Sequence, residues 1–263
     1  METPPGGSAL ADPVAVLAAL AAGTLRAAEP DSLTPDGWRV NLDVKAAILA
    51  AFADRATDTW EVGPFAFHDR AAFPPIDPGP DRRIVPGGTA IRTGAHLEPG
   101  VVVMPPSYVN VGAWIGAGSM VDSHVLVGSC AQIGERVHLG AAVTIGGVLE
   151  PPGARPVIVE EDVFVGAGSR LLEGVLVQRG AVIGAGVVLT GTSRVFDLVR
   201  ERELTGSPEQ RLVIPAGAIV VPGSRPLPGE WPRSQGLSIA TPLIVKDRDP
   251  GTDARVALES ALR

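Results

Sequence analysis

Residues 85–121 read VPGGTAIRTGAHLEPGVVVMPPSYVNVGAWIGAGSMV, and every sixth residue of this stretch is aliphatic. The same spacing continues to Ile145 and resumes at Val159, after the segment EPPGARP at 150–156. The third residue after an aliphatic position is often glycine, which readily adopts the positive φ of a tight corner. The positions with this spacing are Val85, Ile91, Leu97, Val103, Val109, Ile115, Val121, Val127, Ile133, Leu139 and Ile145, then Val159, Val165, Leu171, Val177, Ile183, Leu189, Val195, Ile214 and Val220.

A period of six matches neither the 3.6-residue period of a helix nor a simple strand alternation. It predicts a short strand and a corner, repeated along a solenoid. Three such strands close one triangular coil, and successive coils stack about 4.8 Å apart through backbone hydrogen bonds. Burying each Val, Leu or Ile in the interior is worth roughly 1.5–3 kcal/mol before ordering entropy is subtracted. A β-sandwich would not keep this spacing for so long, so we expect a mainly β protein with a β-helix over 84–224.

Composition limits the partners and the compartment. The 263-residue chain has a net charge of −7, which argues against nucleic acid and against an anionic membrane surface. Its only lysines are Lys45 and Lys246, so an anion site must rely on arginine or on backbone amides. The single cysteine, Cys130, excludes an internal disulfide and fits a reducing compartment. The apolar run at 14–25 is too short to span a bilayer and lacks a preceding basic residue, so we expect a cytoplasmic protein.

Outside the repeats the sequence predicts two helices and several connecting segments. Asp12 followed by proline is typical of a helix start, and this helix should end near Ala22. A second helix is expected over 41–54, because its apolar residues recur at helical spacing. The remaining expectations are a disordered segment at 1–11, an extended segment at 24–28, a loop-like linker at 55–83, a charged loop at 196–211, a Pro-rich turn after Gly223, a strand at 237–246 and a helix over about 252–262. These elements give a small N-terminal helical domain with its linker over 12–83 and a C-terminal strand and helix cap over 225–263.

The candidate chemical groups are few. A zinc site would need histidines that meet, and His124 and His138 are fourteen residues apart, which places them on different faces of the triangle. We therefore expect no metal, and we interpret His138 as a structural corner residue. Asp122 directly follows an aliphatic position where the pattern mostly has Gly, Ala or Asn. Asp122 either forms a structural hydrogen bond at the corner or acts as a general base, and the nearby His124 is a second candidate for the general base.

Several segments resemble one family of enzymes. The chain is similar to the tetrahydrodipicolinate N-succinyltransferases, a branch of the hexapeptide-repeat acyltransferases, over nearly its whole length beyond residue 22. The resemblance implies a left-handed parallel β-helix, a homotrimer, and active sites in grooves between subunits. The segments that carry it are MPPSYVNV at 104–111, MVD at 120–122, GSCAQIGERVHL at 128–139, IGGVLEP at 145–151, GAGSRLLEG at 166–174 and PAGAIVVPG at 215–223.

The resemblance also implies the reaction and its residues. The amino group of an opened tetrahydrodipicolinate attacks the thioester of succinyl-CoA, a co-substrate, in lysine and diaminopimelate biosynthesis. The family's catalytic aspartate corresponds to Asp122, and the arginine that binds an acceptor carboxylate corresponds to Arg83. Ser129 and Arg170 are further candidates for substrate binding. No residue is assigned to CoA from the sequence.

The chain departs from the family at functional positions. Arg170 stands where the family has its second catalytic glutamate, and His124 stands where the family has tryptophan. Glu173 could supply the missing negative charge, or the site could be retuned for a more acidic ligand. Three functions remain open. They are tetrahydrodipicolinate N-succinyltransferase, a related enzyme that acylates a different amine in a specialised pathway, and a catalytically inactive trimeric scaffold.

Overall fold

A computed structural model of the chain describes residues 12–151, 154–249 and 251. The segment at 1–11 that was predicted to be disordered lies outside the described residues, as does the helix predicted over 252–262. Among the described helices, none is long and apolar enough to cross a membrane.

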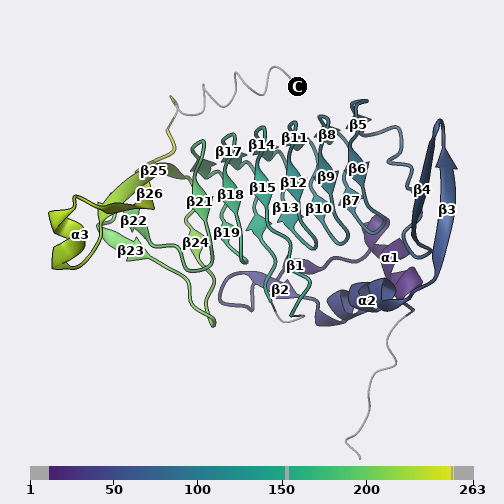
Figure 1. The fold of residues 1–263 in the computed structure, drawn as a ribbon, viewed down its shortest axis with the longest axis horizontal. Helices are drawn as coiled ribbons and strands as arrows, with labels where there is room; N and C mark the ends of the chain where they lie inside the picture. The colour runs from purple at the N-terminus through teal and green to yellow at the C-terminus, as the bar shows by residue number, and fades with distance from the viewer. Residues whose placement is uncertain (1–11, 152–153, 250, 252–263) are drawn as a thin grey trace, which may run out of the picture.

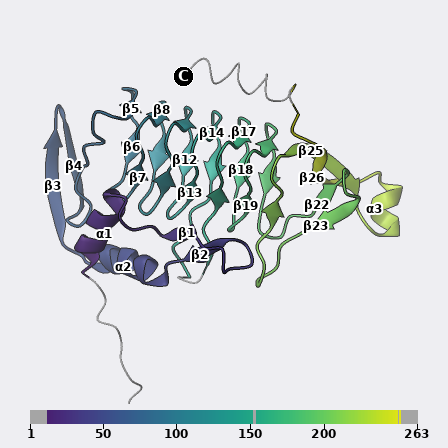
Figure 2. The same ribbon diagram turned by 180° about the vertical axis from the view of Figure 1, so that it is seen from behind.

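The repeats form a left-handed parallel β-helix with three faces, as the period of six predicted (Figures 1 and 2). Each strand pairs with the strand one coil further on, and Trp114 pairs with Gln132, eighteen residues later. Three hexapeptides therefore make one coil. The face that we call the covered face contains β7 (His96–Leu97), β10 (Trp114–Ile115), β13 (Gln132–Ile133), β16 (Ile158–Val159), β19 (Leu176–Val177) and β24 (Val213–Ile214). The open face contains β6 (Ala90–Ile91), β9 (Tyr108–Val109), β12 (Leu126–Val127), β15 (Thr144–Ile145), β18 (Arg170–Leu171) and β21 (Val188–Leu189).

The third face belongs to a longer sheet, which we call the ten-stranded face. Its coil strands are parallel until β25, after which β26 pairs antiparallel with β25 and parallel with β22. The sheet therefore continues past the last coil, at the end of the solenoid opposite the N-terminal domain (Figure 1). Its members are β5 (Arg83–Ile84), β8 (Val102–Val103), β11 (Met120–Val121), β14 (His138–Leu139), β17 (Phe164–Val165), β20 (Val182–Ile183), β25 (Ala218–Pro226), β26 (Ser238–Asp247), β22 (Val195–Asp197) and β23 (Arg202–Leu204).

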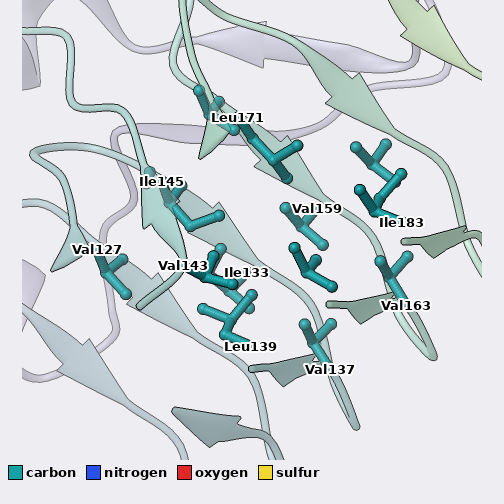
Figure 3. Packing of buried hydrophobic residues seen from close by; sticks show 14 of the residues in the cluster. Val127, Ile133, Val137, Leu139, Val143, Ile145, Val159, Val163, Leu171 and Ile183 are labelled. Atoms are coloured by element: carbon teal, nitrogen blue, oxygen red, sulfur yellow. The ribbon is translucent and has the colours of Figure 1, made fainter. Parts of the chain in front are cut away.

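The aliphatic columns fill the interior of the solenoid (Figure 3). Val127, Ile133 and Leu139 come from the three faces of a single coil and are all fully buried. One prediction of the spacing is wrong at its start, because Ile84 rather than Val85 pairs with Val103 and packs against the core. Seven residues rather than six separate Ile84 from Ile91, since the first turn is one residue longer.

The N-terminal domain covers one face of the solenoid. It contains α1 (Pro13–Ala21), α2 (Leu42–Ala53) and the antiparallel pair β1 (Ala28–Pro30) and β2 (Trp38–Val40). The Asp12 side chain caps α1 by accepting a hydrogen bond from the amide of Val14, as predicted. Arg26 joins the domain to the solenoid, because its guanidinium lies 4.1 Å from the ring centre of Trp114 and its Nε donates to Gln132 at 3.0 Å. Burial lowers the pKa of this guanidinium to about 10.

Two connecting segments contain more regular structure than expected. The prediction of a loop-like linker at 55–83 is wrong, because β3 (Thr57–Val62) and β4 (Phe65–Arg70) form an antiparallel hairpin. Alternating residues such as Trp60 and Phe67, which lie opposite each other, favour this pairing. The charged loop likewise contains the antiparallel strands β22 and β23. Instead of a simple turn after Gly223, β25 continues to Pro226, and the short helix α3 (Glu230–Ser234) leads to β26.

Candidate active site

Asp122 lies in the turn that follows β11, where the chain passes from the ten-stranded face to the open face. Its backbone N–H donates to Leu139 O in the next coil at 2.9 Å. Its Oδ1 accepts from the amide of Ser123 at 2.6 Å, and its carbonyl accepts from Ser107 Oγ at 2.8 Å. The backbone and one carboxylate oxygen are thus fixed, while no hydrogen bond among the described residues uses Oδ2. A half-buried carboxylate held in this way has one oxygen available to take a proton from a ligand.

His124 belongs to the same turn and is exposed. Its φ of 61° places it in the left-handed region that most corners of this solenoid give to glycine. The His124 amide donates to Pro106 O in the preceding coil at 2.7 Å. Because Asp122 and His124 share one short turn, both can reach a ligand that lies along this edge. We call the edge between the ten-stranded face and the open face the Asp122 edge.

The next three coils present only small residues or valine along the Asp122 edge. The corner residues are Gly140, Ala141, Ala142 and Val143, then Gly166, Ala167, Gly168 and Ser169, then Gly184, Ala185, Gly186 and Val187. The glycine after each strand is required by close packing, since a Cβ on Gly166 would lie 2.5 Å from the amide nitrogen of Ala185. A smooth ridge therefore runs about 14 Å from the coil of Asp122 to the coil of Gly186.

A cavity of about 380 Å³ opens where this ridge ends. Its walls come from the last corner at 186–188, from Thr192, Ser193 and Arg194, and from the extension of β25 and β26. Arg194 lies just before β22 and makes a bidentate ion pair with Glu203. Arg225 lies in β25 and also lines the cavity. Sequence reasoning did not find this cavity. The repeated Gly and Ala corners were visible, but only the coil assignment shows that they share one edge.

Two arginines lie on either side of Asp122 along the solenoid axis. Arg83 lies in β5, two coils before Asp122, and Arg170 lies in β18, two coils after it. Each is about 10 Å from the Asp122 coil along the axis. Arg83 belongs to the ten-stranded face and Arg170 to the open face, and both are exposed. No ion pair among the described residues involves either guanidinium, so both can bind a carboxylate of a ligand.

Ser129 and Glu173 lie on another edge, where the open face meets the covered face. Ser129 is 7 % exposed, and its carbonyl accepts from the amide of Val148 at 3.1 Å. Glu173 is exposed, and its Oε2 accepts from the amide of Gly191 at 3.1 Å. Within one chain the open face separates these two residues from Asp122 and His124. The predicted site residues therefore form two groups that a single chain does not bring together.

Two other residues with reactive side chains, Cys130 and His138, have structural roles. Cys130 is fully buried, and burial raises the pKa of its thiol to about 12, which makes it a poor nucleophile. The prediction that His138 is a corner residue is wrong, because His138 lies within β14 and is 5 % exposed. Its ring packs edge-on against the ring of Phe164, with 5.0 Å between the ring centroids. Among the described residues, no group of three or more His, Cys, Asp or Glu side chains is arranged to hold a metal ion.

Comparison with known proteins defines the class. Residues 156–191 match the family model described as "Hexapeptide repeat of succinyl-transferase". This match and the β-helix show that the solenoid is built from hexapeptide repeats of the kind found in succinyltransferases.

Curated relatives define the family more closely. The chain is 44% identical to the 2,3,4,5-tetrahydropyridine-2,6-dicarboxylate N-succinyltransferase of Azoarcus sp. (strain BH72), over 97% of this chain and 90% of that protein. It is 41% identical to the protein of the same name from Rhodospirillum rubrum, over 95% of this chain and 87% of that protein. The chain belongs to the 2,3,4,5-tetrahydropyridine-2,6-dicarboxylate N-succinyltransferase family. A solved structure from Campylobacter jejuni, described as a putative 2,3,4,5-tetrahydropyridine-2-carboxylate N-succinyltransferase, aligns with a TM-score of 0.49 and 19% identity, over 87% of this chain and 61% of that chain.

Proposed function

We propose that the chain transfers a succinyl group from succinyl-CoA to the amino group of ring-opened tetrahydropyridine-2,6-dicarboxylate, in lysine and diaminopimelate biosynthesis. The observation that carries the proposal is the fixed carboxylate of Asp122 at the start of a ridge of small residues. Identity above 40% to relatives of this name, over nearly the whole chain, supports the same reaction.

The chemistry needs a proton acceptor and a site for negative charge. The acceptor's ammonium loses a proton to the Asp122 carboxylate, and its nitrogen then attacks the thioester carbonyl. A C–N bond forms and the C–S bond breaks through a tetrahedral intermediate, whose oxyanion backbone amides can stabilise. The nitrogen of the intermediate carries one proton more than the amide product, and this proton passes to the departing CoA thiolate. The proton held by Asp122 is then released to solvent. His124, in the same turn, is the alternative proton acceptor.

The shape of the Asp122 edge suggests how acyl-CoA binds. The thioester lies beside Asp122, and the pantetheine arm follows the ridge of small residues toward the last coil. The nucleotide end of CoA reaches the cavity near Gly186, where Arg225 supplies positive charge for its phosphates. No lysine lines this cavity, so arginine and backbone amides take that role.

Completion of the site requires more than one copy of the chain. We place Ser129 and Glu173 of one chain opposite Asp122 of a neighbour, in a homotrimer with three such grooves. Arg83 and Arg170 then bind the carboxylates of the acceptor and of the succinyl group. We place the trimer in the cytoplasm, which fits the single reduced cysteine.

A related activity is the second candidate. The charge of Arg170 favours a ligand with an additional acidic group, and such a ligand could be another amine of a specialised pathway. An inactive trimeric scaffold is the third possibility. Thiol release from succinyl-CoA separates the three. Release that depends on tetrahydrodipicolinate, or on its stable analogue 2-aminopimelate, supports the proposed enzyme. Release only with another amine supports the related activity, and no release with any amine supports the scaffold.

A further inference from the structure

A second groove lies on the covered face, opposite the edge that carries the candidate active site. Its volume is about 920 Å³, within the range of small-molecule sites. Leu176 of β19 and Val213 of β24 form an aliphatic floor. The walls are the turn at 34–38 between β1 and β2, Arg155 of the excursion, and residues 209–211 of the charged loop. Acyl transfer at the Asp122 edge makes no use of these residues.

Two buried cations fix the backbone on both sides of Arg155. Lys45 Nζ, with the lysine fully buried in α2, donates to Ala154 O at 2.6 Å. Arg211 Nη1 donates to Pro156 O at 3.3 Å, and the Arg211 side chain is only 2% exposed. Burying a cation is costly unless it is well paired, so two buried cations beside one residue indicate that its position matters.

The Arg155 side chain is itself held at the rim of the groove. One of its Nη groups donates to the carbonyl of Glu209, and its other guanidinium N–H groups donate to none of the described residues. Guanidinium has five donors in a planar fork, so Arg155 can still bind a carboxylate with two parallel hydrogen bonds.

The remaining charges of the groove are mainly negative. Arg211 pairs with Asp36 at 2.6 Å, so these two neutralise each other. Glu160 accepts from Trp38 Nε1 at 3.2 Å and from the amide of Arg179 at 3.0 Å. Each carboxylate oxygen can accept two hydrogen bonds, so each oxygen of Glu160 retains capacity. With Glu209, the lining contains three carboxylates and two guanidiniums, which leaves a net charge of −1.

We propose that this groove binds a free diamino monocarboxylic acid, an amino acid with a cationic side chain. Its carboxylate pairs with Arg155, and its two ammonium groups lie near Glu160 and Glu209. Its methylene chain rests on the half-buried side chain of Val213. The ligand's net charge of +1 balances that of the groove. The site is separate from acyl transfer and does not depend on the proposed function.

Isothermal titration calorimetry of the full-length protein with L-lysine tests the proposal. L-Norleucine keeps the carboxylate and the apolar chain but lacks the second amine, and cadaverine keeps both amines but lacks the carboxylate. We expect lysine to bind at least about tenfold more tightly than either probe, because each lost charged contact costs roughly a factor of ten. Absence of lysine binding would overturn the proposal. If cadaverine binds as tightly as lysine, the groove is a polyamine site and the proposal is wrong. If norleucine binds as tightly as lysine, Glu160 and Glu209 do not recognise a second ammonium group and the proposal is also wrong.

Matched variants locate the site. Arg155→Gln and Glu160→Gln should each weaken lysine binding about tenfold or more. Arg39→Gln and Glu161→Gln change neighbouring charges outside the lining and should leave binding unchanged. Asp122→Asn should also bind lysine normally, and a loss there would assign the binding to the active site and overturn the proposal. Glu209→Gln gives an exposed alternative should Glu160→Gln lower the thermal unfolding midpoint.

Discussion

Asp122 and Arg170 lie two coils apart along the solenoid axis, Asp122 on the Asp122 edge and Arg170 on the open face that this edge borders. Asp122 follows a strand of the ten-stranded face, whereas Arg170 lies in a strand of the open face, paired with Thr144 and Val188. An axial separation of about 10 Å is too long for a direct ion pair but suits one amino dicarboxylate, whose amino group faces Asp122 and whose distal carboxylate pairs with Arg170. This geometry leads to separate tests of the two residues.

Asp122→Asn should keep the fold and lose roughly 10²–10⁴ in kcat. Asparagine preserves the Oδ1 acceptor for the Ser123 amide but cannot take up a proton. Thiol release from succinyl-CoA measures the loss, and circular dichroism checks the fold. His124→Gln is the companion variant. An unchanged rate in Asp122→Asn, combined with an inactive His124→Gln, would show that His124 rather than Asp122 is the proton acceptor.

Arg170→Gln should raise the KM of one carboxylate-bearing substrate about tenfold, with little change in kcat, because it removes a binding charge and no proton acceptor. Steady-state kinetics with each substrate varied in turn identifies which carboxylate is bound. Arg179→Gln removes an arginine from another edge of the solenoid and serves as the control.

The charge reversal Arg170→Glu tests the alternative in which the site has been retuned. If this variant gains kcat/KM with succinyl-CoA and 2-aminopimelate, the natural substrate is a different amine. If it loses activity and Glu173→Gln is also inactive, Glu173 supplies the catalytic carboxylate and the retuning hypothesis is wrong.

The protein should sediment as a trimer of about 81 kDa, given chains of 27.0 kDa. The reason is that Ser129 and Glu173 are separated from Asp122 by the open face within one chain. Sedimentation equilibrium gives the mass. A monomer that still transfers succinyl groups would refute the shared groove.

Two glycine substitutions should differ because of the space around each residue. A Cβ on Gly128 would lie 2.1 Å from the amide nitrogen of Gly147, so Gly128→Ala requires the backbone of two coils to move apart. Gly168 has a φ of +71° but no atom within 4 Å of the added Cβ, so Gly168→Ala should cost only about 1–2 kcal/mol. Urea unfolding should show the larger loss for Gly128→Ala. Equal losses would mean that the coils tolerate separation.

Asp197 should make stability depend on acid pH. Burial acts to raise the pKa of its carboxyl, but hydrogen bonds from the Arg200 amide and Arg202 Nε, with the Arg200 charge, outweigh burial and hold the pKa below its ordinary value. This stabilisation is present above the unfolded pKa of about 3.9 and is lost as pH falls through the lower folded value. The thermal unfolding midpoint of Asp197→Asn should therefore lie below that of the parent at pH 7 and approach it as the pH falls below about 4. A constant difference across this range would contradict the assignment.

The sequence by itself determined the solenoid. A period of six with aliphatic residues at one phase and glycine at another is compatible with few other folds, because each hexapeptide must bury one residue and turn one corner. The same local rules determined α1, α2 and the strand at 238–247. The hairpin of β3 and β4 was missed because its strands bury little, so their pattern is weak.

Only the tertiary structure decided which residues share an edge. Asp122 and Gly186 are 64 positions apart in sequence, yet both lie on the Asp122 edge because eighteen residues complete one coil and the excursion at 150–156 shifts the count. Ser129 is much nearer to Asp122 in sequence and lies on a different edge. Likewise, the groove around Arg155 exists because the N-terminal domain packs on the covered face and two buried cations hold the backbone at Ala154 and Pro156 there. Such long-range contacts depend on how the coils close and stack, which no local pattern specifies.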